Sequence, residues 1–230
     1  MANVASASTV TKGDPLGGCW FSAPAANFLE SGAVKSTLLT AMNTYVTGSG
    51  DNDWATLTSG FTYVSDISDA GVVLSESTDK TEFKNMDGDT ILVVKTSRSE
   101  TAKVTPVDLT VDSLKQIYGD NNVDGTGSVI KVHHNGDAQA DRIALFLLAY
   151  AYQGTTRRGV VLIPRYQINE KGDETLLSSA LFGRELTLDT LPAIVDNKKD
   201  TIYEVIAPVP QATQSQQPAQ PAQQSQQGEG

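Results

Sequence analysis

The chain has 230 residues and a net charge of −10, and 39% of its residues are hydrophobic, which is enough for a core. This length accommodates one or two domains, and the acidic balance excludes the clustered Lys and Arg of a surface that binds duplex DNA. Cys19 is the single cysteine, so no intrachain disulfide can form. The N-terminus lacks the pattern of a signal peptide, and the most apolar run, 143–152, is shorter than the ~20 residues of a spanning helix. We therefore expect a soluble, non-secreted protein.

The first part of the chain is irregular in pattern. Residues 1–18 are small and polar with Gly and Pro between them, which predicts an N-terminal arm. The main domain is expected over 19–208, and its segment 24–60 predicts a long loop because Ser, Thr, Gly and Asn surround one apolar stretch at 38–46. Such a long connection inside a domain is usually functional or mobile.

Period-two alternation predicts strands from residue 61 onward. Polar turns are expected between them, at 69–71, at 98–100 and most clearly in the NMDGD motif of 85–89. The strand candidates are 61–64, 72–77, 78–84, 90–97, 101–105, 128–133, 142–152, 160–170, 176–187 and 201–206. Residues 209–230 are mainly Gln, Pro, Ala and Ser without an apolar pattern, and this composition predicts a disordered tail.

One stretch, 105–125, has the apolar spacing of a helix. Thr110 is a candidate N-cap, and Gly119 suits the left-handed position that ends a helix. The apolar residues that share a face are Val107, Val111, Leu114 and Tyr118. We expect a mainly β fold, a β-sandwich or barrel with one short α-helix that covers a sheet.

The motif after this helix, DNNVDGT at 120–126, matches the first half of a calcium-binding loop, with oxygen ligands at alternate positions and a Gly at the sixth. Position twelve of the loop is Lys131, where a bidentate Glu is needed. A strand, not a second helix, is predicted to follow. A polar turn between helix and strand is therefore the better interpretation.

The histidines offer little for catalysis. His133 and His134 are the only two, and neighbours in a strand point to opposite faces, so they cannot easily share a metal ion. Cys19 lies beside Trp20, which favours a packed thiol over a nucleophile. We predict no catalytic, cofactor-binding or metal-binding residue.

Paired charges are interpreted in the same way. Asp51 with Asp53, and Asp87 with Asp89, lie next to Asn and Gly and are expected in solvated turns. A glycosidase would use such pairs, but its cleft is lined with aromatic residues, which are 7% of this chain and scattered. Arg157-Arg158 predicts solvated charge in a hairpin turn, or an inter-subunit salt bridge.

Several motifs together, over about 15–208, resemble the major tail protein (tail tube protein) of long-tailed phages that infect actinobacteria and their relatives. Each motif is weak alone, and their order and spacing carry the likeness. They are DAGVVLSES at 69–77, EFKNMDGDT at 82–90, LKQIYGDNNV at 114–123, RGVVLIPRYQI at 158–168 and YEVI at 203–206. The chain departs from many relatives in the bulk of 24–60, and in its Gln/Pro tail, where some relatives carry an immunoglobulin-like domain.

The resemblance implies a structural virion protein and not an enzyme. In that family six subunits form a ring, rings stack into a tube, and the inner sheets of neighbours join into one continuous β-barrel around a channel. The implied partners are further copies of the chain, a tape measure protein in the lumen, and the tail terminator and distal tail or baseplate proteins. Genomic DNA would pass through without sequence-specific binding. The protein would belong to the virion tail, assembled in the host cytoplasm, with no cofactor and no membrane partner.

Specific expectations follow for the assembly. We assign the barrel wall to 72–84 with 90–105 and to 142–152 with 160–170, each strand with one wet face, and place the helix 111–118 outside the sheet. Segment 38–46 is expected to contact another subunit, so that deletion of 32–51 stops polymerisation and leaves a folded monomer. Removal of 211–230 should leave tube formation intact. The alternative is a carbohydrate- or surface-binding β-sandwich module, which would need exposed aromatic residues on one face.

Overall fold

The computed structural model describes residues 16–48, 53–107, 110–126, 129–134, 140–152, 155–172 and 184–207. Within them the chain is mainly β, as expected. No helix of the described ranges is long and apolar enough to cross a membrane. The elements are β1 (Leu16–Pro24), η1 (Ala25–Asn27), β2 (Leu29–Glu30), β3 (Ala33–Val34), α2 (Ser36–Thr47), α3 (Asp53–Leu57), β4 (Thr62–Lys84), β5 (Thr90–Pro106), α4 (Val111–Tyr118), η2 (Asp120–Asn122), β6 (Val123–Thr126), β7 (Val129–Val132), β8 (Arg142–Tyr152), β9 (Thr155–Lys171), β10 (Leu186–Thr190), β11 (Ala193–Val195), β12 (Lys198–Asp200) and β13 (Tyr203–Ile206).

The main sheet is antiparallel, with the strand order β10–β5–β4–β1–β8–β9–β13. Strand β10 pairs with β5 on one side and with the second half of β9 on the other, so this sheet closes into a barrel. Strand β13 pairs with the earlier part of β9, and a small sheet of order β12–β11–β3–β2 stands beside it. A barrel without open edges forms inside a single chain.

The central parts of strands β1, β8 and β9 are buried on both faces. Trp20 and Phe146 belong to one apolar cluster, and their strand neighbours Phe21 and Leu145 belong to a second cluster on the opposite face. Alternating side chains of a strand point to opposite faces, so two covered faces demand the continuous apolar runs seen here. The expectation of one wet face is wrong for Ile143–Leu147 and Val160–Ile163, which are buried at every position.

Helix α2 covers the second of these faces. Its buried side chains meet Phe21, Leu145 and their neighbours in the core. They are Leu38, Met42, Tyr45 and Val46. The long loop predicted over 24–60 is therefore wrong, because the segment holds α2, α3 and two short strands. Segment 38–46 is core within the subunit, and deletion of 32–51 would remove it and unfold the chain.

Helix α4 packs against the cluster on the other face, to which all six barrel strands contribute, so it covers the inner face of the barrel and the predicted position outside the sheet is wrong. Thr110 accepts a hydrogen bond from the Ser113 backbone N–H at 3.0 Å, and the Thr110 N–H donates to Ser113 Oγ at 2.8 Å, which completes a capping box. Gly119 has φ 95°, the positive region that glycine adopts easily, and ends the helix. Leu114 and Ile117 lie in the same cluster as Trp20.

Two predicted boundaries are corrected. The predicted turn at 69–71 is an irregularity within β4, where the pairing register shifts between Ile67 and Val72, and the predicted turn at 98–100 lies inside the continuous strand β5. Strand β1 begins at Leu16, within the predicted arm, whose remainder lies outside the described residues, as does the tail 209–230. Of the predicted strand 176–187, only its end is described, in β10.

Candidate assembly surface

The calcium-like loop carries no metal-binding geometry. Asp120 begins the short helix η2, and its carboxylate lies 3.4 Å from the Arg142 guanidinium. Asp124 pairs with Lys131 across β6 and β7, so position twelve is a strand residue. No group of three or more His, Cys, Asp or Glu within the described ranges could hold a metal ion. Residues 120–122 form the short turn after α4, and residues 123–126 are already strand β6.

The two histidines and the cysteine contact other parts of the same chain. His134 lies edge-on to the Tyr118 ring, with centroids 4.7 Å apart, and the His133 backbone N–H donates to the Asn122 carbonyl. Cys19 is fully buried, and its Sγ lies 3.3 Å from Asp66 Oδ1. A thiol enclosed in this way cannot meet a substrate from solution.

Arg158 was expected in solvent and is largely enclosed. Its guanidinium lies over the Tyr45 ring, 5.1 Å from the centroid, and 3.5 Å from the Asp53 carboxylate. Burial raises the pKa of Tyr45 to about 12, and the nearby Arg158 partly offsets this rise. The partner of Arg158, Asp53, belongs to the same chain, so this ion pair joins α3 to β9. Arg158 therefore does not form the inter-subunit salt bridge that was predicted as one alternative. Asp51 lies outside the described residues.

A buried polar network joins α4 to the barrel. The Tyr166 hydroxyl donates to Gln116 Oε1 at 2.9 Å and lies 2.9 Å from Ser22 Oγ, which in turn accepts from Arg142 Nε. Burial raises the pKa of Tyr166 to about 12, so the hydroxyl stays neutral at ordinary pH. The network satisfies polar groups inside the core and offers no nucleophile. Sequence spacing gave no signal of it, because its members come from four different elements.

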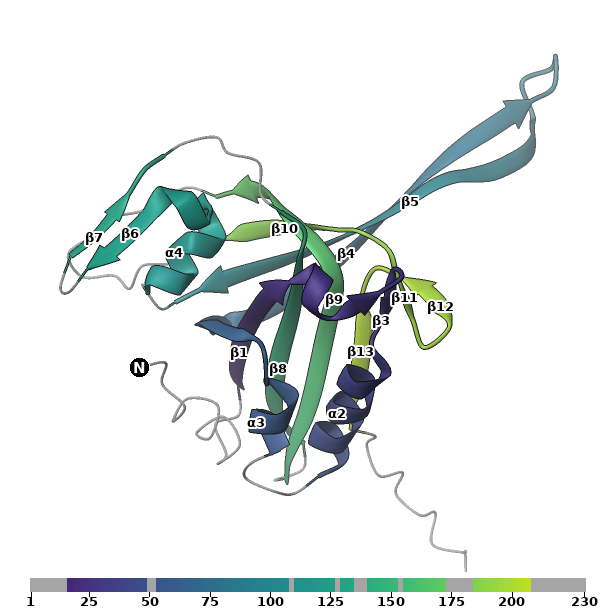
Figure 1. Cartoon of the computed structure of the whole chain (residues 1–230). Helices are drawn as coiled ribbons and strands as arrows, with labels where there is room; N and C mark the ends of the chain where they lie inside the picture. Colours follow the sequence, from purple (N-terminus) through teal and green to yellow (C-terminus); the bar gives the residue numbers. More distant parts are fainter. Residues whose placement is uncertain are drawn as a thin grey trace, which may run out of the picture.

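The feature that remains is a long hairpin. We call residues 76–100, the outer part of β4 and β5, the ribbon. Figure 1 shows it extending far beyond the rest of the molecule. Strand β1 pairs with β4 only as far as Asp66, and β10 pairs with β5 only from Thr101 inward. In the ribbon, β4 and β5 therefore pair with each other alone, and both outer edges have free backbone groups.

The tip of the ribbon is well determined by its sequence. The Asn85 side-chain oxygen accepts backbone N–H groups of Asp87 and Asp89, at 3.1 and 2.7 Å. Gly88 has φ 89°, which a residue with a side chain rarely adopts. The predicted turn is confirmed, and it places Asp87 and Asp89 in exposed positions at the end of the hairpin.

Large apolar side chains are exposed along the ribbon. Phe83 and Leu92 are paired across the strands, and Thr81 is paired with Val94, so these four share one face. Phe83 is 50% exposed and Leu92 54%. Ile91 and Val93 are exposed on the opposite face, next to lysines. Two strands with this many exposed apolar groups and no third layer are marginal in water unless another chain covers them.

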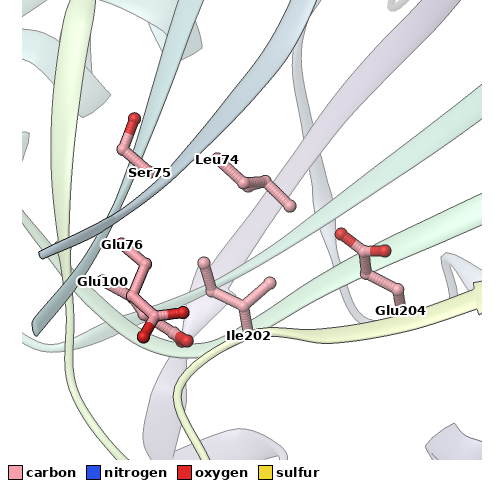
Figure 2. Close-up of a pocket in the computed structure, with 6 residues that line it drawn as sticks. All are labelled: Leu74, Ser75, Glu76, Glu100, Ile202 and Glu204. Atoms are coloured by element: carbon pink, nitrogen blue, oxygen red, sulfur yellow. The ribbon is translucent and has the colours of Figure 1, made fainter. Parts of the chain in front are cut away.

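A hollow of about 310 Å³ lies where the ribbon meets the barrel. Leu74 and Ile202 form its apolar part, and both pack against the cluster that contains Trp20. In Figure 2, the carboxylates of Glu76 and Glu100 lie on one side of Ile202 and Glu204 lies on the other. The hollow is open to solvent and acidic, whereas the ribbon beyond it carries both acidic and basic side chains, three of them lysines.

Comparisons with known proteins give likenesses to solved structures alone. No protein-family profile and no curated protein matches the chain. A chain in a solved structure described as the tail of an empty GTA particle with C6 symmetry is similar, at 13% identity and a TM-score of 0.33. The match covers 58% of this chain and 84% of that one. A TM-score this low does not establish a shared fold, so the function is argued from the geometry above.

Proposed function

We propose that this chain is a structural protein that assembles with copies of itself into stacked rings and forms the tube of a phage tail. The ribbon is the observation that carries the proposal. It has exposed apolar residues on both faces, two free strand edges, and no part of its own described chain to cover them. In a tube built of identical subunits, every subunit has further copies of the same chain as neighbours, and such a copy can cover the ribbon.

Within this proposal the ribbon reaches the neighbouring subunit and extends its sheet. Unpaired backbone groups along both edges can bond to a neighbouring strand, as in other cases of strand addition. Joined sheets of six subunits would surround a channel, through which a tape measure protein and later the genome pass. The net charge of −10 favours sliding of DNA over binding, because like charges repel.

The wall of such a channel is assigned to the ribbon strands and not to the centre of β8 and β9. The latter have both faces buried within the subunit, which leaves no face for a lumen. Tail terminator and distal tail proteins would bind the two ends of the tube, and the virion tail would be the location of the protein.

The carbohydrate-binding alternative loses its support. Trp20 is fully buried, and Trp54 packs against the core beside α2. Among the aromatic residues whose side chains the structure describes, Phe83 alone is exposed, on the ribbon. A sugar-binding face needs several aromatic rings that converge, and the described surface does not offer them.

The proposal is tested with the full chain by sedimentation velocity and negative-stain microscopy. We expect rings or tubes with a central channel. A triple variant, Phe83→Ser, Leu92→Ser and Val94→Ser, should keep its fold and remain monomeric, because the apolar face is removed. Val129→Ser, an exposed apolar position on β7, is the matched control and should assemble as the wild type does.

A wild-type chain that stays monomeric at every concentration would contradict the proposed function. Assembly of the triple variant to the wild-type extent would show that the ribbon does not mediate it. Circular dichroism of each variant distinguishes loss of assembly from loss of folding.

A further inference from the structure

The ribbon carries two pairs of like charges at different heights. Near its base Glu76 lies directly opposite Glu100, and farther out Lys80 lies directly opposite Lys95. Like charges that face each other directly across two strands destabilise a hairpin. Along β4, positions 76 and 80 are an even number of residues apart, so their side chains point to the same side of that strand, and on β5 a bulge at residue 96 separates the two partners.

The inner pair belongs to the hollow at the ribbon base, which we call the socket. Its rim has three carboxylates, from Glu76, Glu100 and Glu204. Arg98 is the cation beside them: its Nε lies 3.1 Å from Glu76, and its guanidinium also contacts Glu100. Three carboxylates against one guanidinium leave the socket with an excess of negative charge.

The floor of the socket is apolar, with Leu74 and Ile202 both partly buried. Thr201 donates a hydrogen bond to Glu100, which fixes the carboxylate to the segment before β13. The occupant that fits an apolar floor and an acidic rim is a lysine, since its long aliphatic stem packs on apolar surface and its ammonium group stays at the rim.

The outer pair has the complementary chemistry. Lys80 and Lys95 are exposed, and neither forms an ion pair within the described residues. Val93, on the same face, is 49% exposed and adds an apolar surface beside them. Glu82, also on this face, accepts a hydrogen bond from Thr90 at 3.4 Å.

The two pairs of one chain cannot neutralise each other. Four residues of strand separate Lys80 from Glu76, about 13 Å, which is longer than a lysine side chain. The lysine pair therefore meets a socket only on another molecule. Such a contact joins two different surfaces of the same protein, and repetition of it closes a ring or builds a helical filament.

We propose that subunits associate head to tail through this contact: Lys80 and Lys95 of one copy enter the socket formed by Glu76, Glu100 and Glu204 of the next copy. The inference rests on the proposed self-assembly and names the surfaces that set its direction. Repulsion between Lys80 and Lys95, and the negative charge that Arg98 leaves unneutralised in the socket, are both reduced when the two surfaces meet, so the contact also favours the assembled state over the free subunit. Charge complementarity of this kind selects the partner and its register.

The test is a charge exchange between two variants of the full chain. The first carries Lys80→Glu and Lys95→Glu, and the second carries Glu76→Lys and Glu204→Lys. Glu100 is left unchanged because it is tied to Thr201. The control, Lys198→Glu with Lys199→Glu on β12, changes the net charge by the same amount as the first variant, at exposed positions away from the ribbon.

Each charge variant alone should associate at least about tenfold more weakly than the wild type in sedimentation velocity, because like charges then meet at the contact. An equimolar mixture should recover assembly, since in a ring that alternates the two variants every contact joins opposite charges. The control should assemble normally. Circular dichroism should show that every variant is folded.

Wild-type assembly together with unimpaired assembly of the first variant would overturn this inference and leave the proposed function standing. A folded pair of variants that is dissociated alone and still dissociated when mixed would also overturn it. A wild-type chain that never assembles would overturn the proposed function itself. The three results are distinct, so failure of the contact is not confused with failure of assembly.

Discussion

The barrel and the ribbon are two regions of the same sheet with opposite surroundings. In the barrel, Phe146 is fully buried between β1 and β9, and both faces of its strand are covered. On the ribbon, Phe83 is 50% exposed on a strand that has one neighbour. The same residue type thus serves stability within the subunit in one region, and is available for contacts between subunits in the other.

The difference shows that apolar content alone does not mark a core. Residues 91–94 are as apolar as 160–163, yet the first run is exposed and the second is fully or nearly fully buried. A run becomes core only where both of its faces are covered, as α2 covers one face of β9 and the barrel interior with α4 covers the other. The exposed run therefore indicates a missing layer, which we assign to a neighbouring copy.

A matched pair of phenylalanine substitutions gives the strongest test of the difference between the barrel and the ribbon. Phe146→Ala should lower the free energy of unfolding by about 3–5 kcal/mol, because it leaves a cavity in the core. Phe83→Ala should change the stability of the monomer by no more than about 0.5 kcal/mol, because its ring is half in water. Urea unfolding of dilute, monomeric protein measures both. Equal losses would mean that the ribbon is part of the same core.

A second pair of substitutions tests which side of α2 belongs to the core. Met42→Ala should cost about 2–5 kcal/mol, since this side chain is fully buried. Thr40→Ala, on the exposed side of the same helix, should be close to neutral because alanine favours a helix. Thermal unfolding of the two variants gives the comparison. A neutral Met42→Ala would restore the idea that this segment serves assembly and not folding.

The smallest expected effect concerns an ion pair on the barrel. Asp141 accepts hydrogen bonds from Arg165 and Gln167, and the bond from Arg165 is the main cause that lowers the pKa of Asp141. A lowered folded-state pKa gives stability that is present above the unfolded value of about 3.9 and is lost as pH falls through the folded value. The group is partly exposed, so the contribution is at most about 1 kcal/mol.

Asp141→Asn should therefore be less stable than the wild type at neutral pH, and the gap in stability should narrow as pH falls through the lowered folded-state pKa of Asp141. Urea midpoints of the two proteins across this range give the measurement. A gap that is independent of pH would show that the carboxylate charge contributes nothing and that only its hydrogen bonds matter.

Much of the fold was predictable where local chemistry decides it. The cap at Thr110, the stop at Gly119 and the turn around Gly88 each depend on a few neighbouring residues, and all three are confirmed. Helix α2 was missed because Ser36–Thr47 is rich in Ser, Thr and Asn, which are weak helix formers. Burial of its apolar stripe against β8 and β9 outweighs that preference.

The features of the candidate assembly surface also fall into two groups, those that the sequence predicts and those that only the structure shows. The sequence by itself determined the charge pattern, the apolar run at 91–94 and the hairpin turn between β4 and β5, because each is a property of adjacent residues. Only the tertiary structure decided that β4 and β5 run past their neighbours, that Glu204 joins Glu76 and Glu100, and that Arg158 lies inside the subunit. These facts depend on where strands distant in sequence begin and end beside one another, and pairing over such distances leaves no local pattern in the chain.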